Sequence, residues 1–259
     1  RSSTMYLVII VSAILAVVGL IMYYNQIKKG FKTTHLNDKY NWGLYVQGFF
    51  YFSALAAGTL IFISIVAFFD LQQLKHVVEF GAVVSFCLFL CAGLTLGADL
   101  GQPARLLKIL FGNNFRSPLT WDFYMISLCM VLSFGYIIGI PFVNMIAGYI
   151  WAVVAIIASF VYTIIHSLFF LSRAEGGLNS EPFLGLEKVL HCIWGGAAVF
   201  VLIALDSVEN QYLLGTLLIA TVLSITPLVG KALIPSQGQK KQFNSTLYLT
   251  FSIILLLLI

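Results

Sequence analysis

The sequence has very little charge for its length. Only 9% of its 259 residues are Asp, Glu, Lys or Arg, and 60% are apolar, whereas a typical soluble domain has about 25% charged residues. So little charge does not cover a surface that faces water, which excludes a soluble enzyme, a disordered tail and a nucleic-acid-binding protein. Together with a mean hydropathy of +0.98, the composition predicts an all-α integral membrane protein.

Cysteine is also scarce, and its four residues all lie inside apolar runs. An iron–sulfur cluster needs about four thiolates grouped at a loop-like spacing, and the sequence contains no Cys-x-x-Cys pair. We therefore expect no cluster and no other metal site on this chain. Because thiols at membrane depth are poor candidates for disulfides, we interpret them as small buried hydrophobes. The four residues are Cys87, Cys91, Cys129 and Cys192.

Long apolar runs dominate the rest of the sequence. A transmembrane helix needs about 20 apolar residues, and seven runs fall in that range, whereas an eighth is too short to cross. We expect a bundle of about eight transmembrane helices, the last one truncated, that forms one domain over residues 1–259. This domain has an extra N-terminal span (1–24), a core (25–234) and the start of the truncated helix (246–259). The runs are Met5–Tyr24, Leu44–Phe69, Val77–Ala98, Trp121–Ile140, Met145–Leu171, Val189–Leu205, Tyr212–Ile234 and Thr246–Ile259.

The connections between these runs indicate an orientation. Three are short, and four are longer and polar, and alternating helices place all four longer connections on one face. This long-loop face carries 12 of the 14 basic residues. Because basic loops stay in the cytoplasm, the count predicts a cytoplasmic long-loop face. The four longer connections are Asn25–Asn41, Asp99–Thr120, Ser172–Lys188 and Pro235–Ser245.

Several polar residues lie within the runs, and ionisable groups at membrane depth are functional candidates. Asp99 closes the third run and Asp122 opens the fourth. His166 lies roughly 9 Å inside the fifth run, at 1.5 Å per residue. His191 has a similar position in the sixth run, and Gln47 lies early in the second. All lean toward the long-loop face, which suggests the mouth of a site for a polar, lipid-soluble ligand.

Each of these residues also has a purely structural interpretation. Asp122 at a helix start favours the positive end of the helix dipole without any catalytic role. Asp99 begins a helix-ending turn and could pair with Arg105. His166 could be a hydrogen-bonded packing residue, and Gln47 could bond to a neighbouring helix.

The second run has two further features. The small residues Ser53–Gly58 in its middle allow another helix, or a flat ligand, to approach the backbone closely. Aromatic residues that include Trp42 and Tyr45 crowd its start. These rings form either an interfacial belt or a pocket in which a ring stacks.

Three motifs carry a resemblance to a known family. Asn41–Gly58 reads NWGLYVQGFFYFSALAAG, Asp99–Arg105 reads DLGQPAR and Asn114–Asp122 reads NFRSPLTWD. In this order, with His166 ahead of a polar loop, they resemble the NrfD/PsrC family, the membrane subunits of polysulfide-reductase-type oxidoreductases. The span ahead of WGLY makes the chain most similar to the membrane subunits of periplasmic hydrogenase and of the Dsr sulfite-reduction complex. The resemblance covers roughly residues 5–235.

The resemblance implies a function in electron transport. Members of the family bind a quinone, either menaquinone or ubiquinone, as substrate, and they carry no haem or iron–sulfur cluster. They exchange electrons with a docked, ferredoxin-like subunit that holds four iron–sulfur clusters. A further subunit holds the catalytic centre, which is molybdopterin, a hydrogenase centre, haem or another group. The expected location, among membrane lipids, is the cytoplasmic membrane of a prokaryote. Family members turn the quinone-site face to the periplasm, whereas the charge count here favours the cytoplasm.

Carried over to this sequence, the resemblance assigns roles to individual residues. His166, Asp99 and Asp122 become the candidate catalytic residues that take up or release protons, because a histidine titrates near neutral pH and carboxyl groups serve as general acids and bases. The far halves of the helices offer few groups for a proton path across the bundle. The candidate quinone-binding residues are Trp42, Tyr45, Gln47, Arg105 and Trp121.

Three other classes of protein remain open on the sequence. In a b-type cytochrome, His166 and His191 would clamp one haem iron. A transporter would have related halves and helices broken at mid-membrane. A plain anchor for a catalytic partner would use the polar residues only for assembly and would bind no quinone analogue.

Overall fold

The structure is a computed structural model that describes residues 2–29, 43–70, 74–99, 112, 117–173, 184–204, 215 and 222. Within these residues the protein is all-α, and six helices are long and apolar enough to cross a membrane. The prediction of a multi-pass helical membrane protein is therefore confirmed, and six of the predicted runs are helices. The runs at 212–234 and 246–259 lie outside the described residues, apart from two isolated positions. The six helices are α1 (Ser2–Lys29), α2 (Leu44–Asp70), α3 (Lys75–Asp99), α5 (Pro118–Ile137), α6 (Met145–Arg173) and α7 (Leu184–Ala204).

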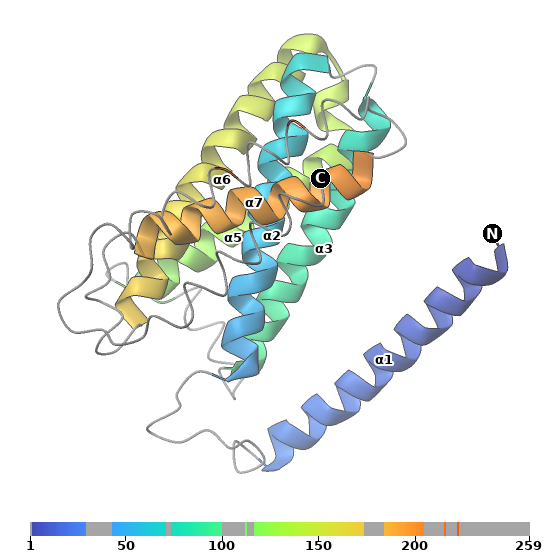
Figure 1. The fold of residues 1–259 in the computed structure, drawn as a ribbon, viewed down its shortest axis with the longest axis vertical. Helices are drawn as coiled ribbons and strands as arrows, with labels where there is room; N and C mark the ends of the chain where they lie inside the picture. The colour runs from blue at the N-terminus through green and yellow to red at the C-terminus, as the bar shows by residue number, and fades with distance from the viewer. Residues whose placement is uncertain are drawn as a thin grey trace.

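Helix α2 lies at the centre of the bundle. It packs against α3, α6 and α7, while α5 packs between α3 and α6. Helix α1 stands apart from the other helices (Figure 1), and its apolar side chains are exposed along most of its length. The core is therefore made by α2, α3, α5, α6 and α7.

The crossing of α2 and α7 depends on two glycines. A Cβ atom built on Gly58 would collide with the carbonyl oxygen of Cys192 and the backbone of Gly196, and one built on Gly196 would collide with the backbone of Gly58. Only hydrogen at both positions lets the two backbones approach this closely. The small residues of the second run thus admit a neighbouring helix at this point, one of the two interpretations that the sequence left open.

A tight turn joins α5 to α6. Helix α5 ends at Ile137, three residues before the predicted end of the run, because Gly139 adopts a left-handed backbone with φ +83°. A short 3-10 helix, η2 (Ile140–Phe142), follows. The side-chain oxygen Oδ1 of Asn144 then accepts a hydrogen bond of 2.7 Å from the backbone N–H of Ala147 at the start of α6. This short connection makes α5 and α6 antiparallel neighbours, as predicted.

Candidate functional site

Asp122 and His166 meet at one end of the bundle. Asp122 lies four residues into α5 and His166 lies seven residues before the end of α6, about 6 and 10 Å along each helix. Because the two helices are antiparallel, their side chains reach a similar depth. The Nδ1 atom of His166 is 3.1 Å from Oδ1 and 3.3 Å from Oδ2 of Asp122. Asp122 is 0% exposed and His166 is 3% exposed.

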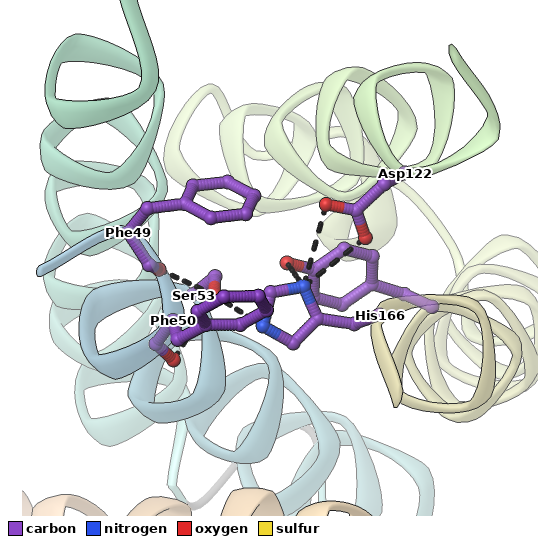
Figure 2. A network of polar contacts seen from close by, with 6 residues as sticks. Phe49, Phe50, Ser53, Asp122 and His166 are labelled. Atoms are coloured by element: carbon purple, nitrogen blue, oxygen red, sulfur yellow. Dashed lines mark hydrogen bonds and ion pairs between the residues drawn. The ribbon is translucent and has the colours of Figure 1, made fainter. Parts of the chain in front are cut away.

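Helix α2 contributes the opposite side of this site (Figure 2). The hydroxyl oxygen of Ser53 lies 3.0 Å from Nε2 of His166. The rings of Phe49 and Phe50 pack against the imidazole, with centroids 5.3 and 4.8 Å away. Phe49 and Ser53 are one helical turn apart, so both side chains point toward α6.

Tyr162 completes the group from the same helix as His166. Its hydroxyl oxygen is 3.2 Å from Nδ1 of His166, and the two residues are four positions apart on α6, which puts them on one face. We refer to these six residues as the His166 cluster: Phe49, Phe50, Ser53, Asp122, Tyr162 and His166.

The pairing of Asp122 with His166 has a clear electrostatic reason. An isolated carboxylate away from water is strongly destabilised, whereas a hydrogen-bonded partner that shares one proton with it offsets that penalty. The pair is neutral overall either as carboxylate with imidazolium or as carboxylic acid with imidazole. It can therefore hold a proton, and pass it between two oxygens and a nitrogen, with little change in net charge. Chemically, the arrangement is suited to proton storage and transfer.

The described residues among the other predicted site residues lie nearer the helix ends than His166 does. Asp99, the last residue of α3, is half-buried, and Trp121 is 47% exposed. The side chain of Gln47 is exposed. Trp42 and Arg105 lie outside the described residues.

Tyr45 is bound to α1. Its hydroxyl donates a hydrogen bond of 2.5 Å to Oε1 of Gln26, and Nε2 of Gln26 donates one of 3.4 Å to the carbonyl oxygen of Ala98. Gln26 is the one buried residue among the described side chains of α1. This small network, the Gln26 latch (Gln26, Tyr45 and Ala98), ties the end of α1 to the start of α2 and the end of α3.

Sequence reasoning does not find every member of these groups. It treats Ser53 only as a small residue, and it assigns no role to Tyr162. The four-residue spacing of Tyr162 and His166 is a signal that could have identified Tyr162. No comparable signal in the sequence connects Ser53 to His166, because the two residues are 113 positions apart.

The contacts of His166 are relevant to the b-type cytochrome alternative, in which His166 and His191 would bind one haem iron. Both ring nitrogens of His166 contact protein atoms, since Nδ1 faces Asp122 and Nε2 faces Ser53. An iron atom would have to displace one of these contacts. Among the side chains that the structure describes, no group of three His, Cys, Asp or Glu residues is placed to hold a metal ion.

A second buried polar group lies toward the opposite end of the bundle. The hydroxyl of Ser85 donates to the carbonyl oxygen of Ala56 at 3.0 Å, and its oxygen lies 3.3 Å from that of Ser133. The hydroxyl of Tyr136 donates to Ser64 at 3.3 Å. We call these four side chains, Ser64, Ser85, Ser133 and Tyr136, the distal hydroxyl group. All are fully buried.

Three proteins of described function are similar to about half of this chain. A protein of Halobacterium salinarum, described as a putative membrane subunit of dimethyl sulfoxide reductase, is 35% identical over 127 residues, or 49% of this chain. A selenate reductase subunit of Mesobacillus selenatarsenatis is 27% identical over 48% of the chain. The integral membrane subunit of menaquinone reductase from Nitratidesulfovibrio vulgaris is 28% identical over 46%. Each match spans 29% of the relative's length.

No solved structure matches the chain. The family model described as "Polysulphide reductase, NrfD" matches residues 32–177, which is more than half of the sequence. This stretch includes α2, α3, α5 and α6, and hence every residue of the His166 cluster. The resemblance inferred from the three motifs is confirmed: the chain belongs to the NrfD family of polysulphide-reductase-type membrane proteins.

Proposed function

We propose that this chain is the quinone-interacting membrane subunit of a multi-subunit respiratory reductase complex. In this role it exchanges electrons between the quinone pool and a docked iron–sulfur subunit. Membership of the NrfD family supports the proposal, as do the names of three relatives, each described as a subunit of a reductase and one of them of a menaquinone reductase. The chain would contribute the quinone site and the proton transfer, and its partners would contribute the redox centres.

The observation that carries the proposal is the buried contact between Asp122 and His166. Oxidation of a quinol releases two electrons and two protons, and reduction of a quinone takes up both. The electrons pass to or from the iron–sulfur partner, so the protons need acceptors and donors on this chain. A carboxyl–imidazole pair located about 6 to 10 Å inside one end of the bundle is suited to this.

The headgroup of the quinone would bind between the His166 cluster and the end of the bundle. Three of the described candidates for this contact occupy the first or last turns of helices: Tyr45 is in the first turn of α2, Asp99 ends α3 and Trp121 is in the first turn of α5. They form the mouth of the proposed site. The full set of proposed contacts is Trp42, Tyr45, Gln47, Asp99, Arg105 and Trp121.

The iron–sulfur subunit would dock over the same end of the bundle, so that the quinone lies within reach of a cluster. A further subunit would carry the catalytic centre. We place residues 1–259 in a single domain in the cytoplasmic membrane of a prokaryote. The 12 basic residues of the long-loop face support a cytoplasmic position for the docking side. Alkaline phosphatase fused within the long connections would be inactive if this orientation holds and active if the face is periplasmic.

The proposal is tested in the assembled complex by two substitutions, Asp122→Asn and His166→Gln. Each is expected to lower electron transfer between a quinol and the iron–sulfur partner by about a hundredfold. Tyr136→Phe is the matched control, since it removes a buried hydroxyl from the distal group and should leave the rate unchanged. Full activity of both site variants, or failure of the wild-type complex to bind a quinone analogue, would contradict the proposal and favour a plain anchor.

A further inference from the structure

The hydrogen-bond geometry at Ser53 restricts the protonation of His166. A serine hydroxyl has one hydrogen to donate, and a carbonyl oxygen can only accept. The hydroxyl oxygen of Ser53 lies 2.6 Å from the carbonyl oxygen of Phe49 and 3.2 Å from that of Phe50. The carbonyl oxygen of Phe49 is thus the nearer of these two acceptors for the single hydrogen of Ser53. A Ser53 hydroxyl that donates to this backbone accepts from Nε2 of His166, 3.0 Å away, and this arrangement puts a hydrogen on Nε2.

The other ring nitrogen has more than one option. Nδ1 faces the two carboxyl oxygens of Asp122 at 3.1 and 3.3 Å and the hydroxyl of Tyr162 at 3.2 Å. It can donate to a carboxylate, or it can accept from a protonated Asp122 or from Tyr162. In each of these arrangements the hydrogen on Nε2 is retained. Only Nδ1 gains or loses a proton.

Ser53 is the hydrogen-bonding side chain that faces Nε2 of His166. The imidazole is 3% exposed, and the rings of Phe49 and Phe50 pack against it. Neither ring can accept a conventional hydrogen bond from Nε2. Without the Ser53 hydroxyl, an N–H group would be buried without a partner, which favours the tautomer with its hydrogen on Nδ1.

We propose that Ser53 is a positioning residue that holds His166 with its hydrogen on Nε2, so that the proton exchanged during quinone turnover passes between Nδ1 and Asp122. This inference rests on the proposed function for its role in turnover. The other part of the inference, that Nε2 of His166 carries the hydrogen, does not depend on quinone chemistry. The hydroxyl acts through His166 and contacts no reacting atom of the substrate.

The test measures the tautomer directly. In the purified complex with ¹⁵N-labelled histidine, the signals of His166 are assigned by their loss in His166→Gln, because the sequence contains three other histidines. The wild type is expected to show a protonated Nε2. Ser53→Ala should show a new population with the hydrogen on Nδ1 and should lower quinol-dependent turnover by about tenfold or more. Ser53→Thr, which retains the hydroxyl, should restore both.

Ser127→Ala is the matched control. The hydroxyl of Ser127 also donates to the carbonyl oxygen four residues earlier, that of Phe123, at 2.9 Å. Its loss removes the same kind of bond from α5, and neither the tautomer nor the turnover should change. Equal amounts of assembled complex for all variants exclude misfolding as the cause of any difference.

An unprotonated Nε2 in the wild type, or an unchanged tautomer in Ser53→Ala, would overturn the inference. A changed tautomer with undiminished turnover would overturn the positioning role. The nitrogen signals are measured without turnover, so a wild-type complex with the expected tautomer but no quinol activity would count against the proposed function alone.

Discussion

The His166 cluster and the distal hydroxyl group are both buried in the same five-helix core, yet they differ in kind. The distal group contains only hydroxyls, which bond to one another or to the carbonyl oxygen of Ala56. The His166 cluster contains a carboxyl group and an imidazole that bond to each other. A buried hydroxyl that bonds to helix backbone costs little, whereas ionisable groups at membrane depth are expensive. Burial of a polar side chain therefore accompanies hydroxyl packing in one region and a buried carboxyl–imidazole pair in the other.

Packing around the two groups supports this distinction. Near the distal group, the ring of Trp151 covers Gly135 so closely that a Cβ there would collide with it, and the indole N–H donates to the carbonyl oxygen of Leu132 at 3.1 Å. The hydrogen bonds of the distal hydroxyl group each join two different helices. In the His166 cluster, the contacts instead converge on one titratable ring.

Gly196→Val should disrupt the folded core that contains both the His166 cluster and the distal hydroxyl group. A side chain there would collide with the backbone of Gly58, separate α7 from α2 and prevent stable insertion of the protein. Gly97→Val is the control, because a Cβ at Gly97 meets nothing within 4 Å. Membrane yield and thermal stability of the two variants measure the effect. Equal yields would show that the α2–α7 contact is not needed for the core.

Asp122→Ala should destabilise the bundle by about 3 kcal/mol, because it leaves His166 without its carboxyl partner in a buried position. The double variant Asp122→Ala with His166→Ala should recover part of this loss, since neither partner is then left unpaired. Unfolding in mixed micelles measures the free energies. Strict additivity of the two single changes would mean that the residues are not coupled.

Ser133→Ala should lower the free energy of unfolding by only about 0.5 to 1 kcal/mol, and it should leave quinol-dependent turnover unchanged. The hydroxyl of Ser85 keeps its bond to the carbonyl oxygen of Ala56 in this variant. Paired stability and turnover measurements test both statements. A marked loss of turnover would move the distal group from packing to function.

Tyr45→Phe should have the smallest effect on stability. It removes one hydrogen bond of the Gln26 latch, so the end of α1 should move away from α2 while the five-helix core persists. Spin labels at Tyr24 and Tyr51, both exposed, would report a broader distance distribution. An unchanged distribution would show that the latch does not hold α1.

Hydropathy and spacing along the sequence were sufficient for much of this protein. They located six helices, identified Asp122 and His166 as ionisable groups near one end of the bundle, and predicted the short turn that makes α5 and α6 antiparallel. These features depend on helix length and on a rise of about 1.5 Å per residue. Both can be counted from the residues alone.

Tertiary structure alone decided which side chains face one another. It brought Ser53 to His166 and Tyr45 to Gln26, while Gln47 on the same helix as Ser53 and Tyr45 is exposed. The rotation of each helix about its axis sets these contacts. In a soluble helix, the polar face shows which side points to solvent. In a membrane helix, apolar side chains face both lipid and neighbouring helices, so the sequence does not show how the helix is rotated.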